Sequence, residues 1–258
     1  MPGKIVRRLK PEEEEILRKR EELAVIRSTL AERELELVDL RSQLAAFEGR
    51  YLRQVGTLYA ELDEWKARVA ELRARLTPSA ASKAQAEDAR EQARQTFEDA
   101  HGKASEAHDF TPSPELRSIY REAAKRIHPD LAIDPADLER RTRFMAAANH
   151  AYEAGDAEAL RRILEEYEDG AEAVKGEGIG AELIRIIRQI SLAKTRVSAI
   201  EQELAALHQS EIGLLKKQTE ESEQAGRDLL AELAAAVREQ IERTKMEYET
   251  LAKRDKLA

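Results

Sequence analysis

The residue types best suited to chemistry meet in one short stretch, Lys-Arg-Ile-His-Pro-Asp over 125–130. His128 offers two ring nitrogens, and Asp130 offers a carboxylate that can pair with an arginine or join a buried polar network. Pro129 fixes its own backbone and forces His128 out of helical geometry, so a helix must end here. The stretch therefore predicts a helix stop followed by a rigid, charged turn.

Elsewhere the sequence offers no catalytic set. There is no cysteine, which excludes disulfides, thiolate nucleophiles and thiolate zinc sites. Carboxylate pairs such as Asp63 and Glu64 recur along charged helical sequence and indicate a solvated surface, and His101 and His108 have no third metal ligand nearby. The glycine-rich stretch 176–180 lacks the strand and spacing of a phosphate loop. We expect no enzymatic activity, no metal and no cofactor.

Two amphipathic helices are predicted on either side of the turn. Residues 115–127, ELRSIYREAAKRI, place apolar residues on one stripe. The basic residues on the other side of this helix are Arg117, Arg121, Lys125 and Arg126. After a loop over 131–139 that we expect to be exposed, a second helix starts near Pro135 or Asp137, with Phe144 and Tyr152 on its apolar face. Gly155 and Asp156 end this helix and start a last short one.

This helix–HPD–helix segment resembles the J domain of the DnaJ/Hsp40 co-chaperone family. The match covers SIYREAAKRIHPD and FMAAANHAYE, with the family's aromatic residue at Tyr120, its phenylalanine at Phe144 and its Ala-Tyr-Glu at 151–153. The long flanking helices are similar to those of bacterial J-domain proteins with coiled-coil arms. The resemblance implies that Tyr120, Phe144 and Tyr152 form the core of a J-like module in which the family's second and third helices pack as an antiparallel pair.

The resemblance also implies a function in binding. In J domains, the HPD loop and the basic face of the preceding helix dock on the ATPase of an Hsp70 and stimulate its ATP hydrolysis. The residues that this role assigns to the present chain are His128, Pro129, Asp130, Arg117, Arg121, Lys125 and Arg126. Their positive charges would steer the encounter with an acidic partner surface. The alternative is a coiled-coil scaffold or spacer whose J-like module is not coupled to an Hsp70.

Long helices must position this module. Apolar residues at 3-4 spacing run from Leu23 to Leu76, with a 4-4 step between Phe47 and Val55 that is typical of a stutter. A second frame runs from 183 to 251 and weakens over 218–225. Such frames predict coiled-coil helices that would bind an unknown client or partner.

The chain is therefore predicted to be all-α. The predicted segments are an N-terminal coiled-coil helix (12–76), a partly helical Ala/Glu/Gln-rich connector (77–111), the J-like module (112–168), a glycine-rich hinge (169–180) and a C-terminal coiled-coil helix (181–256). The similar lengths of the two long helices favour an antiparallel hairpin with the module at its tip. A dimer in which each helix pairs across chains stays open as the alternative, so a homo-oligomer is a further expectation.

Composition supports long helices and narrows the partners. Of 258 residues, 36% are charged and 4% are aromatic, which is typical of helices that bury a narrow apolar stripe. The net charge of −8 argues against nucleic acid as a partner. No stretch approaches the ~20 apolar residues of a membrane span, and the N-terminus has no apolar segment typical of a signal peptide. We expect no membrane association and a cytoplasmic location.

Overall fold

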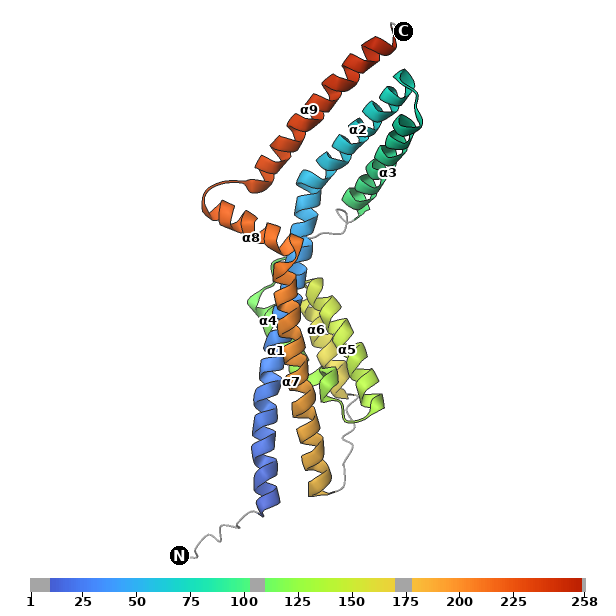
Figure 1. The fold of residues 1–258 in the computed structure, drawn as a ribbon. Coiled ribbons are helices and arrows are strands. Elements are labelled where there is room, and N and C mark those ends of the chain that lie inside the picture. Colours follow the sequence, from blue (N-terminus) through green and yellow to red (C-terminus); the bar gives the residue numbers. More distant parts are fainter. Residues whose placement is uncertain (1–9, 103–109, 170–177, 257–258) are drawn as a thin grey trace, which may run out of the picture. The chain divides into compact units, whose positions relative to one another are not determined.

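The computed structural model describes residues 10–102, 110–169 and 178–256 (Figure 1). Within these ranges every regular element is helical and no strand occurs, which confirms the all-α prediction. In the same part of the chain, no helix is both long and apolar enough to cross a bilayer. Most of the predicted hinge, residues 170–177, and His108 lie outside the described residues.

The chain divides into two compact units. The first unit comprises Met1–Ser42 and Phe110–His208, and the second comprises Gln43–Asp109 and Gln209–Ala258. The division falls within the first long helix, α1 (Pro11–Tyr51), and at the end of α7 (Ile179–Gln209). The HPD turn and all the residues assigned to docking lie in the first unit.

In the first unit, α1 and α7 run side by side in the same direction. Pro11 and the three glutamates after it suit a helix start, because their carboxylates lie at the positive end of the helix dipole. Ion pairs between the two helices include Arg20 with Glu182, Glu34 with Arg196, and Arg41 with Glu203. Each pair is separated by 162 residues, and a constant separation requires parallel helices.

The predicted antiparallel hairpin is therefore wrong for α1 and α7. The prediction relied on the low entropy cost of pairing two helices of one chain. That cost grows only slowly with the length of the connecting chain, so it does not distinguish one orientation from the other. The orientation follows from which side chains meet.

The J-like module consists of α4 (Pro114–Ile127), a single 3₁₀ turn (Pro129–Leu131), α5 (Pro135–Glu153) and α6 (Ala157–Asp169). The side chains of Ser113 and Asp134 cap α4 and α5 by accepting hydrogen bonds from backbone N–H groups in the first turn. Gly155 ends α5 with φ +72°, a left-handed conformation that favours glycine. Asp156 caps α6, because its side chain accepts a hydrogen bond from the Ala159 N–H.

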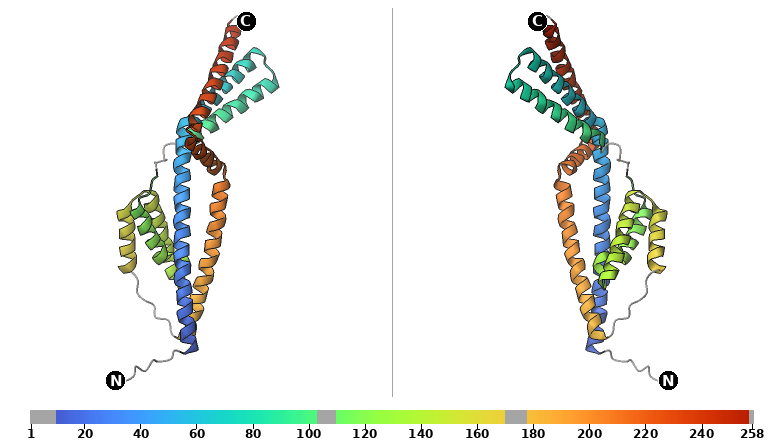
Figure 2. Two further views of the ribbon diagram at one scale, coloured as in Figure 1. Left: turned by 90° about the vertical axis from the view of Figure 1, so that its left-hand side faces the viewer. Right: turned by 90° about the vertical axis from the view of Figure 1, so that its right-hand side faces the viewer.

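The module packs along the flank of α1, as the two opposite views of Figure 2 show. Its apolar core contains Tyr120, Phe144 and Tyr152, as predicted from the resemblance. The same core includes three residues of α1, which are Ala31, Leu35 and Val38. The position at the tip of a hairpin is therefore also wrong, because α1 supplies one wall of the module's core.

The second unit contains the end of α1, a π-helical turn (Leu52–Gly56), α2 (Thr57–Leu76), α3 (Ala80–Gly102), α8 (Glu211–Gln224) and α9 (Leu229–Asp255). The π-helical turn overlaps the predicted stutter, and Val55 within it is fully buried. The core of this unit joins Phe47, Val55 and Leu62 to apolar residues of α9.

The single helix predicted over 181–256 is instead divided into α7, α8 and α9. Ser210 caps α8 by accepting a hydrogen bond from the Gly213 N–H. Gly226, with φ +76°, ends α8, and Asp228 caps α9. Leu214, which lies within the second predicted apolar frame, is exposed. Local capping groups interrupt the heptad frame at both breaks, and the weak stretch over 218–225 lies next to the second of them.

Most of the predicted connector forms α3, an unbroken helix that packs against α2. Arg90 pairs with Glu71 and Glu64, and the Thr96 hydroxyl donates to Asp63, so the two helices are antiparallel. The residues of α3 that are buried are Ala86, Ala93 and Ala100, spaced by seven. Methyl groups at heptad spacing let two helices approach closely. Apolar periodicity did not predict this seam, because the seam contains no large apolar residue.

Candidate functional site

The HPD turn begins where α4 ends. His128 leaves helical geometry, with φ −58° and ψ 133°, because Pro129 follows it. The Nδ1 atom of His128 accepts a hydrogen bond of 3.1 Å from the Asp130 N–H, and Pro129 starts the 3₁₀ turn. This local bonding orients the imidazole so that its Nε2 atom points away from the turn's own backbone.

His128 is buried, with 3% of its surface exposed. Its Nε2 atom lies 2.9 Å from Oε1 of Glu34 on α1. The same carboxylate accepts hydrogen bonds from Arg196 on α7, from Nε at 2.8 Å and from Nη2 at 3.2 Å. Burial raises the pKa of Glu34, but the hydrogen bonds from His128 and Arg196 outweigh that effect and hold the pKa below its ordinary value. The imidazole is therefore tied to α1 and, through Glu34, to α7.

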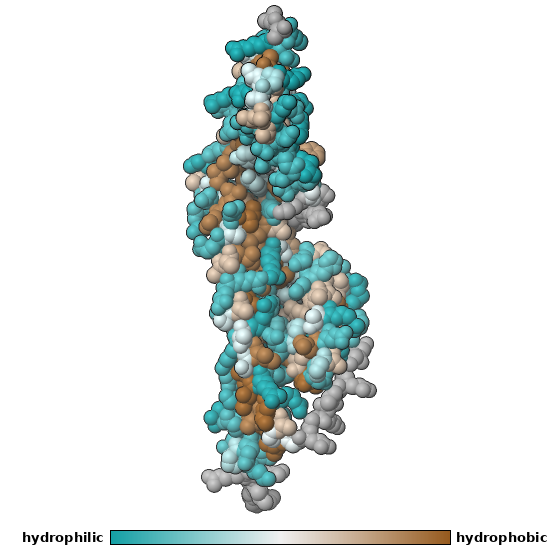
Figure 3. All heavy atoms as spheres, turned by 45° about the vertical axis from the view of Figure 1, so that its right-hand side comes forward, coloured by the Kyte–Doolittle hydropathy of each residue, from teal (hydrophilic) through white to brown (hydrophobic). Residues whose placement is uncertain are grey.

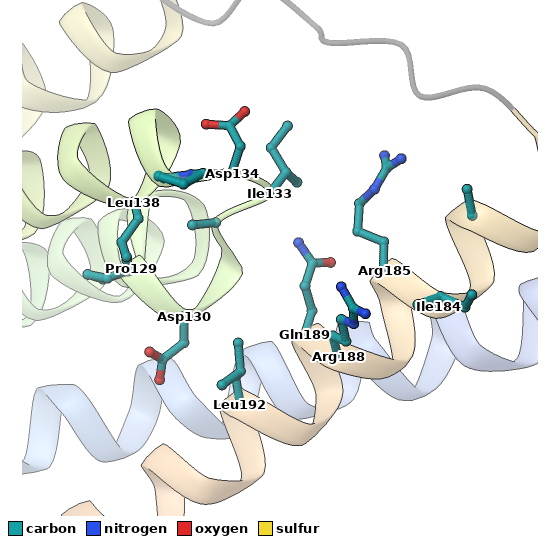
Figure 4. A pocket seen from close by; sticks show the side chains of 13 residues that line it. Pro129, Asp130, Ile133, Asp134, Leu138, Ile184, Arg185, Arg188, Gln189 and Leu192 are labelled. Carbon is teal, nitrogen blue, oxygen red and sulfur yellow. The ribbon is translucent and has the colours of Figure 1, made fainter.

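Asp130 is only half-buried, and burial raises the pKa of its carboxyl group. Pro129 and Asp130 line an open groove of about 670 Å³ whose other wall is α7 (Figure 4). Asp130 points toward α1 in that view, and its side chain is 30% exposed. A partner could therefore reach Asp130, whereas His128 is out of reach.

The groove beside the turn is partly apolar. The face drawn in Figure 3 is mostly hydrophilic and exposes several stretches of hydrophobic residues. Exposed apolar residues of α7 include Ile184 and Leu192, and both line the groove. Arg185 and Arg188 of α7 lie beside them. The groove thus offers apolar contact and positive charge next to the HPD turn.

The four basic residues of α4 differ in their surroundings. Arg117 pairs with Asp39 at 3.1 Å and Arg121 pairs with Glu32 at 3.1 Å, so α1 supplies carboxylates to both. Arg126 pairs with Glu122 one turn back on α4 itself. Lys125 is half-buried and has no ion pair among the described residues. Three of the four predicted docking cations are therefore paired with acidic residues of the same chain.

The aromatic residues of the module hold α4 and α5 together. The ring centroids of Tyr120 and Tyr152 are 4.7 Å apart, and Phe144 meets Tyr167 of α6 edge to face at 5.5 Å. The Tyr120 hydroxyl donates a 2.7 Å hydrogen bond to Asn149, and the Tyr152 hydroxyl donates to Asp39. Burial, the largest cause, raises the pKa of both phenols. They act as hydrogen-bond donors in a packed core.

The loop after the HPD turn was predicted to be exposed, and its first residue is not. Leu131 is 2% exposed and packs against Leu23 of α1 and Ile190 of α7. Its carbonyl oxygen accepts a 2.7 Å hydrogen bond from Nε2 of Gln189. The remaining residues from 133 to 136 are exposed as expected.

Several residues of the site were missed from the sequence. Glu34 and Asp39 lie between apolar residues of α1, where a carboxylate reads as ordinary helical charge. A second apolar stripe at Ala31, Leu35 and Val38, offset from the main seam, was the available signal that α1 contacts more than one partner element. Arg196 and Gln189 carried no signal, because their partners are distant in sequence.

Comparison with known proteins leaves the resemblance to J domains as a prediction. No family model, no curated protein and no solved structure matches this chain.

Proposed function

We propose that this chain is a J-domain-like co-chaperone that docks on an Hsp70 through its HPD loop and α4, and stimulates ATP hydrolysis by that Hsp70. The observation that carries the proposal is the placement of the His-Pro-Asp turn between two helices packed through Tyr120, Phe144 and Tyr152. This is the arrangement that the resemblance implies. Asp130, Lys125 and the outer side of Pro129 are accessible and would form the first contacts.

The long helices would position the module relative to a client or partner. α1 serves this role most directly, because it contributes to the module's core and continues beyond it. The client is unknown, and the exposed apolar residues of α7 would allow a homo-oligomer. A cytoplasmic location is part of the proposal.

The test measures single-turnover ATP hydrolysis by an Hsp70 with and without this protein. We expect the wild-type chain to accelerate hydrolysis, and Asp130→Asn and His128→Gln to abolish the acceleration. His150→Gln is the matched control, because His150 is exposed on α5 and lies outside the docking residues. Acceleration should fall as salt rises, since charged residues steer the encounter.

A second function is favoured by the burial of His128. An imidazole that is 3% exposed and bonded to Glu34 serves to hold the module on α1. Such a chain would be a coiled-coil scaffold whose J-like module is not coupled to an Hsp70. The scaffold is supported, and the co-chaperone fails, if no acceleration occurs with the wild type or with a variant whose HPD loop has been released.

A further inference from the structure

The HPD loop is held in place by two long helices of its own unit. Leu131 inserts between α1 and α7, where it packs with Leu23 and Ile190 and is almost fully buried. Gln189 of α7 reaches toward the loop (Figure 4) and bonds the Leu131 carbonyl oxygen. Gln189 is itself only 7% exposed, so this hydrogen bond is shielded from water. An apolar anchor and a buried hydrogen bond thus fix the same residue.

A second set of contacts fixes the motif itself. Glu34 bonds His128, and Arg196 bonds Glu34. Gln189 and Arg196 are seven residues apart on α7, so they lie on the same face of that helix, toward the loop. The α1–α7 pair therefore holds both ends of the segment His128–Leu131.

Acidic residues of α1 also take the place of an acidic partner. Glu32 pairs with Arg121, and Asp39 pairs with Arg117 and accepts the Tyr152 hydroxyl. Glu32 and Asp39 are seven residues apart on α1, so both carboxylates lie on the side of that helix that meets the arginines of α4. A partner that approaches with carboxylates meets basic residues whose charge is already compensated.

We propose that the α1–α7 pair is an intramolecular latch that keeps the HPD loop closed, and that docking requires this loop to leave the latch while the module's core stays folded. The proposal rests on the co-chaperone function and adds its regulation. The wild-type chain would spend most of its time in a form that an Hsp70 cannot engage fully.

The packing allows such a local release. Leu131 belongs to a cluster formed by α1 and α7, whereas Tyr120, Phe144 and Tyr152 belong to a separate cluster. The loop's own backbone hydrogen bonds are short-range, from Leu131 to His128 and from Ala132 to Pro129. Releasing the loop therefore breaks the latch contacts and leaves the core of α4, α5 and α6 in contact with α1.

Thiol labelling measures the release directly, because the natural chain has no cysteine. Leu131→Cys places a reporter in the latch, and Ala148→Cys places one in the module's core, where Ala148 is fully buried. When reclosing is faster than labelling, the labelling rate follows the open fraction. Both reporters are made in the full-length chain.

The latch variant is Gln189→Ala, and its matched control is Gln202→Ala, the same substitution at an exposed position of α7. Loss of one buried hydrogen bond should raise the labelling rate of Cys at 131 roughly 5- to 30-fold. The control should leave the rate unchanged, and the core reporter should stay slow in both. Glu34→Gln, which weakens the second set of contacts, should also accelerate labelling at 131.

Two results would overturn the latch. In one, Gln189→Ala and Gln202→Ala label position 131 at the same rate. In the other, Gln189→Ala accelerates the core reporter as much as the latch reporter, which means that the whole module unfolds.

ATP hydrolysis separates the latch from the function. The latch predicts that Gln189→Ala stimulates an Hsp70 more than the wild type does. Faster labelling without stimulation by any variant keeps the latch and rejects the co-chaperone. Stimulation by the wild type with no change in labelling keeps the co-chaperone and rejects the latch.

Discussion

Replacing the buried Glu34 by alanine should lower the unfolding free energy of the first unit more than the loss of an exposed carboxylate would. The Glu34 side chain is 8% exposed and accepts hydrogen bonds from His128 and Arg196. Glu34→Ala leaves the Nε2 atom of His128 buried without a partner, because His128 is itself almost fully buried. Arg196, with 34% of its side chain exposed, can turn to solvent and loses little.

The magnitude follows from these two exposures. An unsatisfied buried polar group costs about 1–3 kcal/mol, and loss of the packed side chain adds to that, so we expect Glu34→Ala to lower the unfolding free energy by about 2–3 kcal/mol. Glu34→Gln keeps an oxygen that can accept from His128 and should cost about 1 kcal/mol. The control Glu36→Ala removes an exposed carboxylate paired with Arg33 and should cost no more than about 0.5 kcal/mol.

Hydrogen exchange of the α4 and α5 amides is the appropriate assay. The only tryptophan, Trp65, lies in the second unit, so its fluorescence does not report on this site. The exchange of α4 and α5 gives the free energy of opening for the first unit. The reasoning is refuted if Glu34→Ala and Glu36→Ala lower that free energy equally, or if Glu34→Ala changes it by less than about 0.5 kcal/mol.

Three further predictions concern pH, α3 and one turn. The pKa of Glu34 is lowered in the folded chain, so the contribution of this carboxylate to stability is present above about pH 4.5 and is lost as pH falls through the folded pKa. The difference in unfolding free energy between wild type and Glu34→Gln should therefore shrink on acidification. A constant difference from about pH 6 to about pH 3 in urea unfolding would contradict this. Ala93→Leu should overpack the α2–α3 contact and lower the unfolding free energy by about 1–3 kcal/mol, measured by Trp65 fluorescence. The control Ala84→Leu, at an exposed position of α3, should be nearly neutral. Equal effects of the two substitutions would disprove the alanine seam. Gly155→Ala should lower the unfolding free energy by about 1 kcal/mol, because Gly155 has a positive φ, and hydrogen exchange in α5 and α6 should become faster. Unchanged exchange would show that the turn tolerates a side chain.

The sequence by itself determined the helices and the turn that carries the motif. Pro129 ends α4 through its covalent ring, and Gly155 and Asp156 separate α5 from α6 through their own backbone preferences. The apolar spacing around Tyr120 and Phe144 placed both in the module's core. These features depend on neighbouring residues, so they can be read directly from the chain.

Only the tertiary structure decided what the motif contacts. His128 meets Glu34 across 94 residues, and Arg196 meets the same carboxylate across 162. The parallel direction of α1 and α7 rests on ion pairs with that same separation, and nothing in the local periodicity distinguishes parallel from antiparallel partners. His128 and Leu131 are buried because they fit side chains of the α1–α7 pair, and side-chain complementarity between segments so far apart leaves no repeating signal in the sequence.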